Sequence, residues 1–182
     1  MKLQTSNSKL QTANFQFQNK ACDGPLEFEI GSLELNIVAF CCHYCAYAAA
    51  DLAGSLRIQY PASVKVVKIP CTGDLDVSSV LEAFEYGADG VMVAGCLEGD
   101  CHYQLGNFNA KRRVNYVKTM LRQIRFEPDR VRMFNMSSAM GRKWAEAVTE
   151  MDETVRRLGP SRLREKETKE TKETRELVQE AI

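Results

Sequence analysis

The 182-residue chain has no net charge, no long apolar run and none of the short motifs that mark nucleotide-binding enzymes. Its 24 basic residues balance its 24 acidic residues, which disfavours nucleic acid as a partner. All its apolar runs fall well short of the roughly 20 residues that span a bilayer. The first twenty residues contain neither an apolar stretch nor arginine, which argues against a signal or transit peptide. We therefore expect a cytoplasmic protein whose thiols stay reduced.

Catalytic signatures are scarce as well. The chain has no G-x-G-x-x-G and no phosphate-binding G-x-x-x-x-G-K-[ST] loop, so nucleotide binding has no support in the sequence. It also lacks a G-x-S-x-G elbow, and two histidines leave few candidates for acid–base work. What it does contain is seven cysteines. In a reducing compartment these favour metal binding or thiol chemistry over a disulfide framework.

Composition divides the chain into three parts, with one domain of ordinary size in the middle. Residues 1–33 are rich in Gln, Asn, Ser and Lys, and we interpret them as an extension that orders on a partner. Residues 34–159 hold the apolar runs and form the predicted domain. Residues 160–182 include a KET repeat with interleaved charges and almost nothing to bury, so we predict a charged tail.

Strand-like and helix-like segments alternate along the predicted domain. Apolar and β-branched runs predict strands at residues 35–40, 64–69, 90–94 and 131–134. Helices are predicted at residues 46–56, 77–86 and 107–125, and a last helix, capped by Asn135 or Ser137, ends before Gly159. The core stripe of that last helix is predicted to be Met140, Trp144, Val148, Met151 and Val155. This order predicts an α/β fold, a small four-stranded parallel sheet with flanking helices, flavodoxin-like or Rossmann-like.

Six cysteines come at or just after the ends of three predicted strands. They are Cys41, Cys42 and Cys45 after the first strand, Cys71 after the second, and Cys96 and Cys101 after the third. The carboxyl ends of parallel strands meet at one edge of a sheet, so the six thiols are expected to converge there.

Convergent thiolates can hold zinc or an iron–sulfur cluster, and spacings of C-x3-C and C-x4-C do not separate the two. Six thiols exceed the need of one zinc ion, which favours iron–sulfur. A thiol–disulfide enzyme using the C-x-x-C of Cys42 and Cys45 is a third interpretation. Because no substrate chemistry accompanies the thiols, the residues favour electron transfer.

The predicted helix at 107–125 is basic on its solvent side. Its cations are Lys111, Arg112, Arg113, Lys118, Arg122 and Arg125, with no acidic residue among them. This is either a solvated helix face or a docking patch for an acidic partner.

Four segments carry a resemblance to a known family. FCCHYCAYAAADLAG (40–54), KIPCTGDLD (68–76), GADGVMVAGCLEGDCHYQLGNFNAKRR (87–113) and FEPDRVRMFNMSSAMG (126–141) resemble the delta-subunit family of methyl-viologen-reducing hydrogenases. The resemblance covers residues 34–158. It implies a [2Fe–2S] electron-transfer subunit that passes electrons from a hydrogenase or formate dehydrogenase to the flavin-containing A subunit of heterodisulfide reductase, in an electron-bifurcating complex.

The family pattern carries cysteines at all six positions named above, and four suffice for one cluster. We predict Cys41, Cys45, Cys96 and Cys101 as the metal ligands, because they form two spaced pairs on adjacent loops. Cys71 could replace one of the four or act as a redox-active thiol beside the cluster. The alternatives to electron transfer are a zinc-stapled structural adaptor in such a complex and a thiol–disulfide oxidoreductase.

Overall fold

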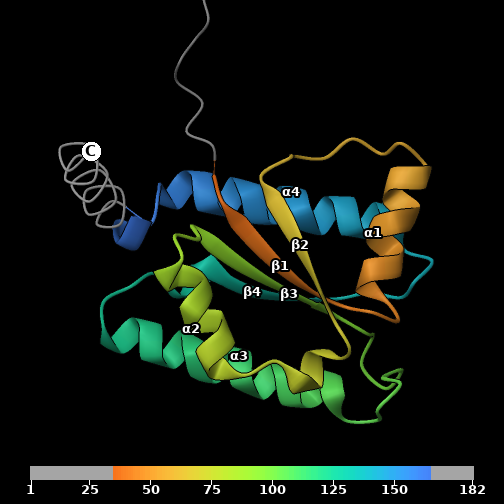
Figure 1. Cartoon of the computed structure of the whole chain (residues 1–182), viewed down its shortest axis with the longest axis horizontal. Helices are drawn as coiled ribbons and strands as arrows, with labels where there is room; N and C mark the ends of the chain where they lie inside the picture. The colour runs from red at the N-terminus through yellow and green to blue at the C-terminus, as the bar shows by residue number, and fades with distance from the viewer. Residues whose placement is uncertain (1–34, 165–182) are drawn as a thin grey trace, which may run out of the picture. The chain divides into compact units, whose positions relative to one another are not determined.

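The computed structural model describes residues 35–164, and these form a parallel sheet with helices on both faces (Figure 1). The predicted extension 1–33 and residues 165–182 of the predicted tail lie outside the described residues. The elements are β1 (Ile37–Cys42), α1 (Ala46–Ser55), β2 (Val64–Ile69), the 3-10 turn η1 (Thr72–Asp74), α2 (Val77–Glu85), β3 (Gly90–Gly95), α3 (Gly106–Gln123), the 3-10 turn η2 (Pro128–Arg130), β4 (Val131–Asn135) and α4 (Gly141–Leu158). The α/β prediction is confirmed.

All strand pairs are parallel, and the strand order is β2-β1-β3-β4. This is the flavodoxin-like order without a fifth strand. The chain moves one way from β1 to β2 and the opposite way from β3 to β4, so the order reverses between β1 and β3. In open α/β sheets ligands bind at the carboxyl ends of the strands beside such a reversal.

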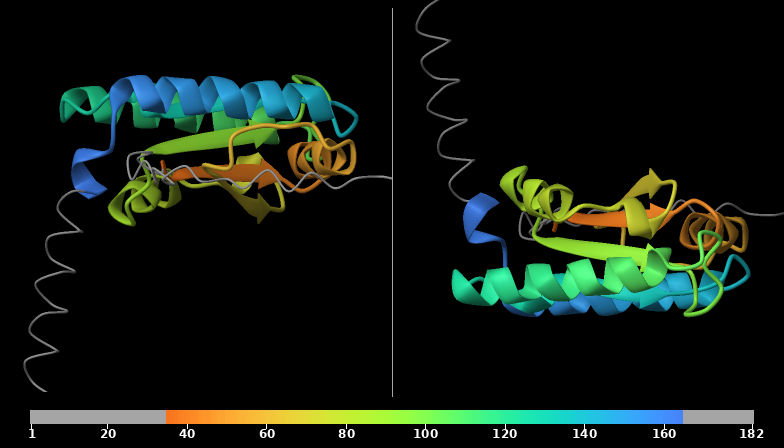
Figure 2. Two further views of the ribbon diagram at one scale, coloured as in Figure 1. Left: turned by 90° about the horizontal axis from the view of Figure 1, so that it is seen from above. Right: turned by 90° about the horizontal axis from the view of Figure 1, so that it is seen from below.

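Two buried clusters lie on the two faces of the sheet. In Figures 1 and 2, α4 covers one face, α2 and α3 cover the other, and α1 stands beside the carboxyl ends of the strands. Alternate residues of β3 enter different clusters, as the pleat requires. Ile37 and Ala39 pack with α1 and α4, whereas Val91 and Val93 pack with α2 and α3. The stripe predicted for the last helix is confirmed, since Trp144, Val148, Met151 and Val155 are fully buried and Met140 is partly buried.

Two local predictions are wrong. The first strand runs to Cys42, so Cys41 and Cys42 lie within β1 and do not follow it. The two thiols extend its apolar run, and Cys41 stands in register with Lys68 and Ala94 on the neighbouring strands. The last helix starts at Gly141 and is not capped by Asn135 or Ser137. Asn135 ends β4 instead, and its side-chain amide donates to the Cys96 carbonyl at 2.6 Å.

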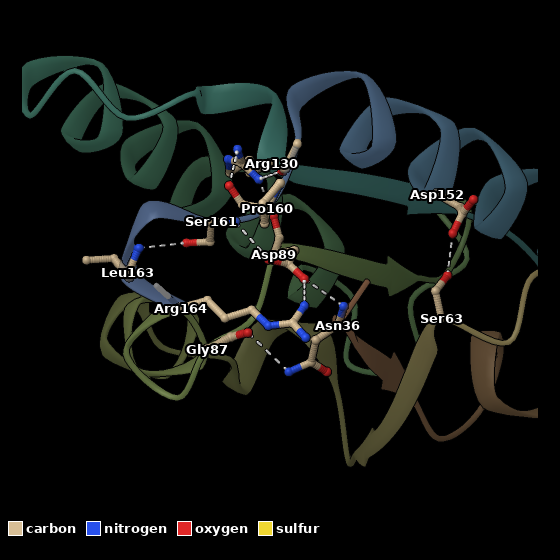
Figure 3. A network of polar contacts seen from close by, with 11 residues as sticks. Asn36, Ser63, Gly87, Asp89, Arg130, Asp152, Pro160, Ser161, Leu163 and Arg164 are labelled. Carbon is tan, nitrogen blue, oxygen red and sulfur yellow. Dashed lines mark hydrogen bonds and ion pairs between the residues drawn. The ribbon is translucent and has the colours of Figure 1, made fainter. Parts of the chain in front are cut away.

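A buried polar network closes the amino edge of the sheet (Figure 3). Fully buried Asp89 precedes β3, and its carboxylate accepts from the backbone N–H groups of Asn36 and Ser161 and from the Arg164 guanidinium, each at 2.8 Å. The buried Arg130 side chain donates to the backbone carbonyls of Asp89 and Gly159, each at 2.9 Å. The network ties the segment after α4 to the sheet edge opposite the cysteines.

Replacement of Asp89 by Ala would leave the Ser161 N–H and other buried donors without an acceptor. We expect this change to lower the free energy of unfolding by roughly 3 kcal/mol. Replacement of Glu150, whose half-exposed carboxylate pairs with Arg132, should cost less than about 1 kcal/mol. Urea unfolding of both variants gives the comparison, and equal losses would refute a structural role for the Asp89 network.

Candidate metal centre

Three cysteines meet at the carboxyl end of the sheet, beside the reversal of strand order. Cys42 ends β1, Cys45 occupies the N-cap position of α1, and Cys96 directly follows β3. Their sulfur atoms all lie within 4.8 Å of one another, and the Cys42 and Cys96 sulfurs are 3.8 Å apart. All three residues are buried. We call this group the sulfur triad.

A second group, the sulfur pair, lies between η1 and the start of α3. Cys71 occupies the N-cap position of η1, and its sulfur lies 4.0 Å from the sulfur of Cys101. The Cys71 sulfur accepts from the Gly73 N–H at 3.3 Å. The Cys101 sulfur faces backbone N–H groups of Tyr103, Gly106 and Asn107, the last two in the first turn of α3.

Cys41 belongs to neither group. It lies one residue before Cys42 on β1, is fully buried and shares the core cluster of Ile37 and Ala39 beneath α1 and α4. Burial, with a smaller effect from nearby Cys42, raises the pKa of the Cys41 thiol to about 12. Cys41 is a weak candidate for a ligand because its sulfur takes part in neither the sulfur triad nor the sulfur pair. Of the six predicted cysteines, the structure therefore brings five together.

Each sulfur group favours one thiolate. The Cys45 thiol donates to Cys42 and lowers the pKa of Cys42 to about 5, against the opposing effect of burial. The same donation, together with burial, raises the pKa of Cys45. Burial raises the pKa of Cys101, but the backbone N–H groups of Tyr103, Asn107 and Gly106 outweigh it, and the net shift is downward. Thiol ligands lose their protons when a metal binds, and a lowered pKa makes that loss easier.

Two glycines let the sulfur pair approach α3. A Cβ atom at Gly106 would overlap the Cys71 sulfur and lie 2.9 Å from the Cys101 sulfur. A Cβ atom at Gly73 would lie 2.5 Å from the Gly106 Cα atom. Both contacts are too short for any side chain, so η1 and α3 meet through glycine on each side. This packing brings the α3 N-terminus against the two thiols.

Three polar side chains that sequence reasoning missed hold the loops of the site. Buried Asn107 donates to the Leu97 carbonyl at 2.6 Å and to the Cys96 carbonyl at 3.4 Å, where Asn135 also donates. The Arg113 guanidinium donates to the carbonyls of Gly73 and, at 3.1 Å, Leu75. Asn107 and Arg113 follow Cys101 in the sequence, and Asn135 ends β4. Polar residues at these positions can reach the loops that carry thiols, so the sequence does indicate a role in the site.

An aromatic cap, defined as Tyr44, His102 and Tyr103, lies beside the thiols of Cys45 and Cys96. The Tyr44 ring stacks on His102 with centroids 4.2 Å apart, and Tyr103 meets both rings edge-on. Beside the cap, a cavity of about 230 Å³ reaches Cys45 and Cys96. The stacking engages the His102 ring, and neither His43 nor His102 joins the sulfur triad.

The described residues thus define a thiol-rich α/β domain with a metal-type donor set at the switch point of a flavodoxin-like sheet. Residues 37–159 match the family described as "Methyl-viologen-reducing hydrogenase, delta subunit". The chain belongs to this family. No helix within residues 35–164 is long and apolar enough to cross a membrane.

Named relatives fall into two groups. The chain is 50% identical over 127 residues to the D-type iron–sulfur subunit of the F420-non-reducing hydrogenase of Archaeoglobus profundus, covering 70% of this chain and 93% of the relative. It is 48% identical over 128 residues to the corresponding iron–sulfur subunit of Methanocaldococcus jannaschii, covering 70% and 96%. It is also 41% identical over 124 residues, 68% of this chain, to 16% of the A subunit of ferredoxin:CoB-CoM heterodisulfide reductase of Methanosarcina mazei. In that reductase chain the matching region is one part of a larger protein.

Replacement of Gly106 by Ala tests the packing of the sulfur pair. The added methyl group would displace Cys71 and Cys101, so we expect metal content after reconstitution to fall severalfold while far-UV circular dichroism is retained. Replacement of Gly54 by Ala is the matched control, because a Cβ atom there meets nothing within 4 Å and Ala favours the helix. Equal metal content in the two variants would show that the sulfur pair is not part of the metal centre.

Proposed function

We propose that this chain is a [2Fe–2S] electron-transfer subunit. In this proposal it passes electrons from a hydrogenase or formate dehydrogenase to the flavin-containing A subunit of heterodisulfide reductase, within a cytoplasmic electron-bifurcating complex. The observation that carries the proposal is the presence of two close sulfur contacts, Cys42 with Cys96 and Cys71 with Cys101, at one sheet edge. The domain that holds them is proposed to be residues 34–159.

The spacing of the sulfurs favours two metal ions over one. A tetrahedral ion with bonds of about 2.3 Å places its sulfur ligands roughly 3.8 Å apart. The sulfur triad could supply three ligands to such an ion, but no fourth Cys, His, Asp or Glu among residues 35–164 completes that group. A [2Fe–2S] cluster takes four cysteines, two on each iron. Separations of 3.8 Å and 4.0 Å suit two such pairs of ligands.

We therefore propose Cys42 and Cys96 as ligands of one iron and Cys71 and Cys101 as ligands of the other. This assignment retains Cys96 and Cys101, which the sequence also predicted as ligands. It replaces the predicted ligands Cys41 and Cys45 with Cys42 and Cys71. Cys41 is assigned to the core, because it is buried and its sulfur takes part in neither close sulfur contact. Cys45 is assigned to the neighbourhood of the cluster, where its thiol reaches Cys42 and Cys96.

A bound cluster would accept and donate one electron at a time. The surrounding residues would adjust the reduction potential of the cluster. Backbone N–H groups of Gly73 and Gly106 point at the Cys71 and Cys101 sulfurs and offset negative charge, which favours the reduced state. The Tyr44 and His102 rings of the aromatic cap line the same cavity as Cys45 and Cys96 and so lie beside these thiols. No side chain is needed for substrate chemistry in this role.

The comparisons support the choice of partners. The relatives of similar length are named as iron–sulfur subunits of hydrogenases, and a larger relative is named as the A subunit of a heterodisulfide reductase. A domain that is fused to a protein in one organism commonly binds the corresponding protein as a separate chain in another. We propose that this chain contacts two partners, one of them a hydrogenase subunit, the other an A-type flavoprotein subunit.

The sulfur triad also favours a second candidate, a zinc-stapled adaptor in the same complex, because three clustered thiols suit a zinc ion with an outside ligand. A thiol–disulfide oxidoreductase is the third candidate, given the hydrogen bond from the Cys45 thiol to Cys42, which lowers the pKa of Cys42. Zinc thiolates are colourless, whereas iron–sulfur clusters absorb visible light. Thiol labelling with and without reductant distinguishes a thiol–disulfide oxidoreductase from the other two candidates.

Cysteine variants of the anaerobically purified chain test the ligand assignment. We expect Cys→Ser changes at Cys42, Cys71, Cys96 and Cys101 to reduce bound iron and sulfide severalfold, because each removes a proposed ligand. Cys41→Ala and Cys45→Ala are the matched controls and should keep the cluster. Iron, sulfide and zinc assays are combined with electron paramagnetic resonance after dithionite reduction. A full cluster in Cys71→Ser would contradict the pairing, and one zinc without iron would support the adaptor.

A further inference from the structure

Asn107 is a polar residue buried in the first turn of α3, with 1% of its surface exposed. Such a side chain is costly to bury unless its polar atoms are paired. Its amide nitrogen donates to the Leu97 carbonyl at 2.6 Å and to the Cys96 carbonyl at 3.4 Å. Its amide oxygen accepts from the Phe108 N–H at 2.9 Å. The oxygen is therefore held by the helix, and the nitrogen is aimed at the segment that follows β3.

The backbone of Asn107 meets the other group of thiols. Its N–H points at the sulfur of Cys101, which lies 4.0 Å from the Cys71 sulfur. The side chain reaches the carbonyl of Cys96, whose sulfur lies 3.8 Å from the Cys42 sulfur. One residue thus holds the main chain of Cys96 in the sulfur triad and faces Cys101 in the sulfur pair.

The segment between Cys96 and Cys101 lies largely in solvent. Residues 98–100 are exposed, and the ion pair of Glu98 with Lys111 is more than half exposed on both sides. Surface pairs of this kind contribute little to stability. A buried amide that donates to two consecutive carbonyls is a firmer hold, because a hydrogen bond away from water is electrostatically stronger. The position of this segment relative to α3 therefore depends on Asn107.

We propose that Asn107 is a positioning residue that sets the span between the two proposed ligand pairs and, through that span, the reduction potential of the cluster. The inference rests on the proposed function and adds the side chain that holds Cys96 in place. A [2Fe–2S] cluster takes two cysteines on each iron, so the two pairs must keep a fixed separation.

The cavity of about 230 Å³ beside the thiols links this hold to the potential. Its lining includes Cys96 and Leu97, the two residues whose carbonyls the Asn107 amide holds. Release of these residues would admit water to the sulfurs. Water stabilises the additional negative charge of a reduced cluster, so the reduction potential would rise.

Replacement of Asn107 by Ala tests the proposal in a chain that should still fold. Each carbonyl that loses the Asn107 amide keeps another donor. The Cys96 carbonyl keeps the Asn135 amide at 2.6 Å, and the Leu97 carbonyl keeps the Asp100 N–H at 3.1 Å. The variant therefore loosens the segment without leaving either carbonyl unpaired.

The matched control is Asn109→Ala, because Asn109 is exposed two residues further along α3. We expect the cluster of Asn107→Ala to have a higher reduction potential and an altered electron paramagnetic resonance line shape. We also expect it to lose iron to a chelator severalfold faster than the cluster of Asn109→Ala. A wild-type potential and line shape in Asn107→Ala, whatever its melting temperature, would overturn the proposal.

Thiol labelling of the cluster-free, reduced chain separates this proposal from the electron-transfer role. Iodoacetamide should label Cys96, which is 5% exposed, severalfold faster in Asn107→Ala than in Asn109→Ala or the wild type. Cys41, in the core cluster beneath α1 and α4, is the internal control and should label slowly in all three chains. Equal labelling of Cys96 in the three chains would overturn the role of Asn107. Faster labelling in the variant of a chain whose wild type binds no iron would refute electron transfer and leave Asn107 as the residue that positions Cys96.

Discussion

The contact between the first turn of α3 and the Cys71–Cys101 sulfur pair is the constraint on which the site depends. It requires glycine at positions 73 and 106, because a Cβ atom at either would meet backbone or sulfur. It also brings backbone N–H groups toward the Cys101 sulfur, and these lower the pKa of that thiol despite its burial. Arg113 fixes the same contact from the next turns of α3 by holding the carbonyls of Gly73 and Leu75. The pair is therefore held by backbone, with little freedom for the sulfurs to move apart.

The amino and carboxyl ends of the strands have different roles. At the amino edge, Asp89 and Arg130 are buried and paired with backbone groups, so polar atoms there serve to lock the chain in place. At the carboxyl edge, the end of β1 and the loops after β1, β2 and β3 supply five thiols to one region. A rigid frame at one edge and a donor set at the other is the division expected when loops of an open α/β sheet hold a ligand site.

Much of this arrangement was predictable from the residues. Alternating apolar runs sufficed for the succession of strands and helices and for the core stripe of α4, because side-chain periodicity reports burial directly. The convergence of thiols followed from the parallel sheet. What the residues could not supply was the direction of each sulfur. Cys41 and Cys42 are neighbours in β1 and both are buried, yet only the Cys42 sulfur lies against the Cys96 sulfur. The position of Asn135 before the last helix predicts a helix cap, but its amide donates to the Cys96 carbonyl, which is distant in sequence.

X-ray absorption at the iron edge of the anaerobically reconstituted chain tests the central claim most directly, since it reports the neighbours of the metal itself. Two pairs of thiolates around a [2Fe–2S] cluster predict sulfur as the nearest neighbour of iron and a second iron just beyond it. Sulfur ligation without an iron neighbour, or a sample that takes up only zinc, would contradict the account and leave the sulfur triad as a single-metal site.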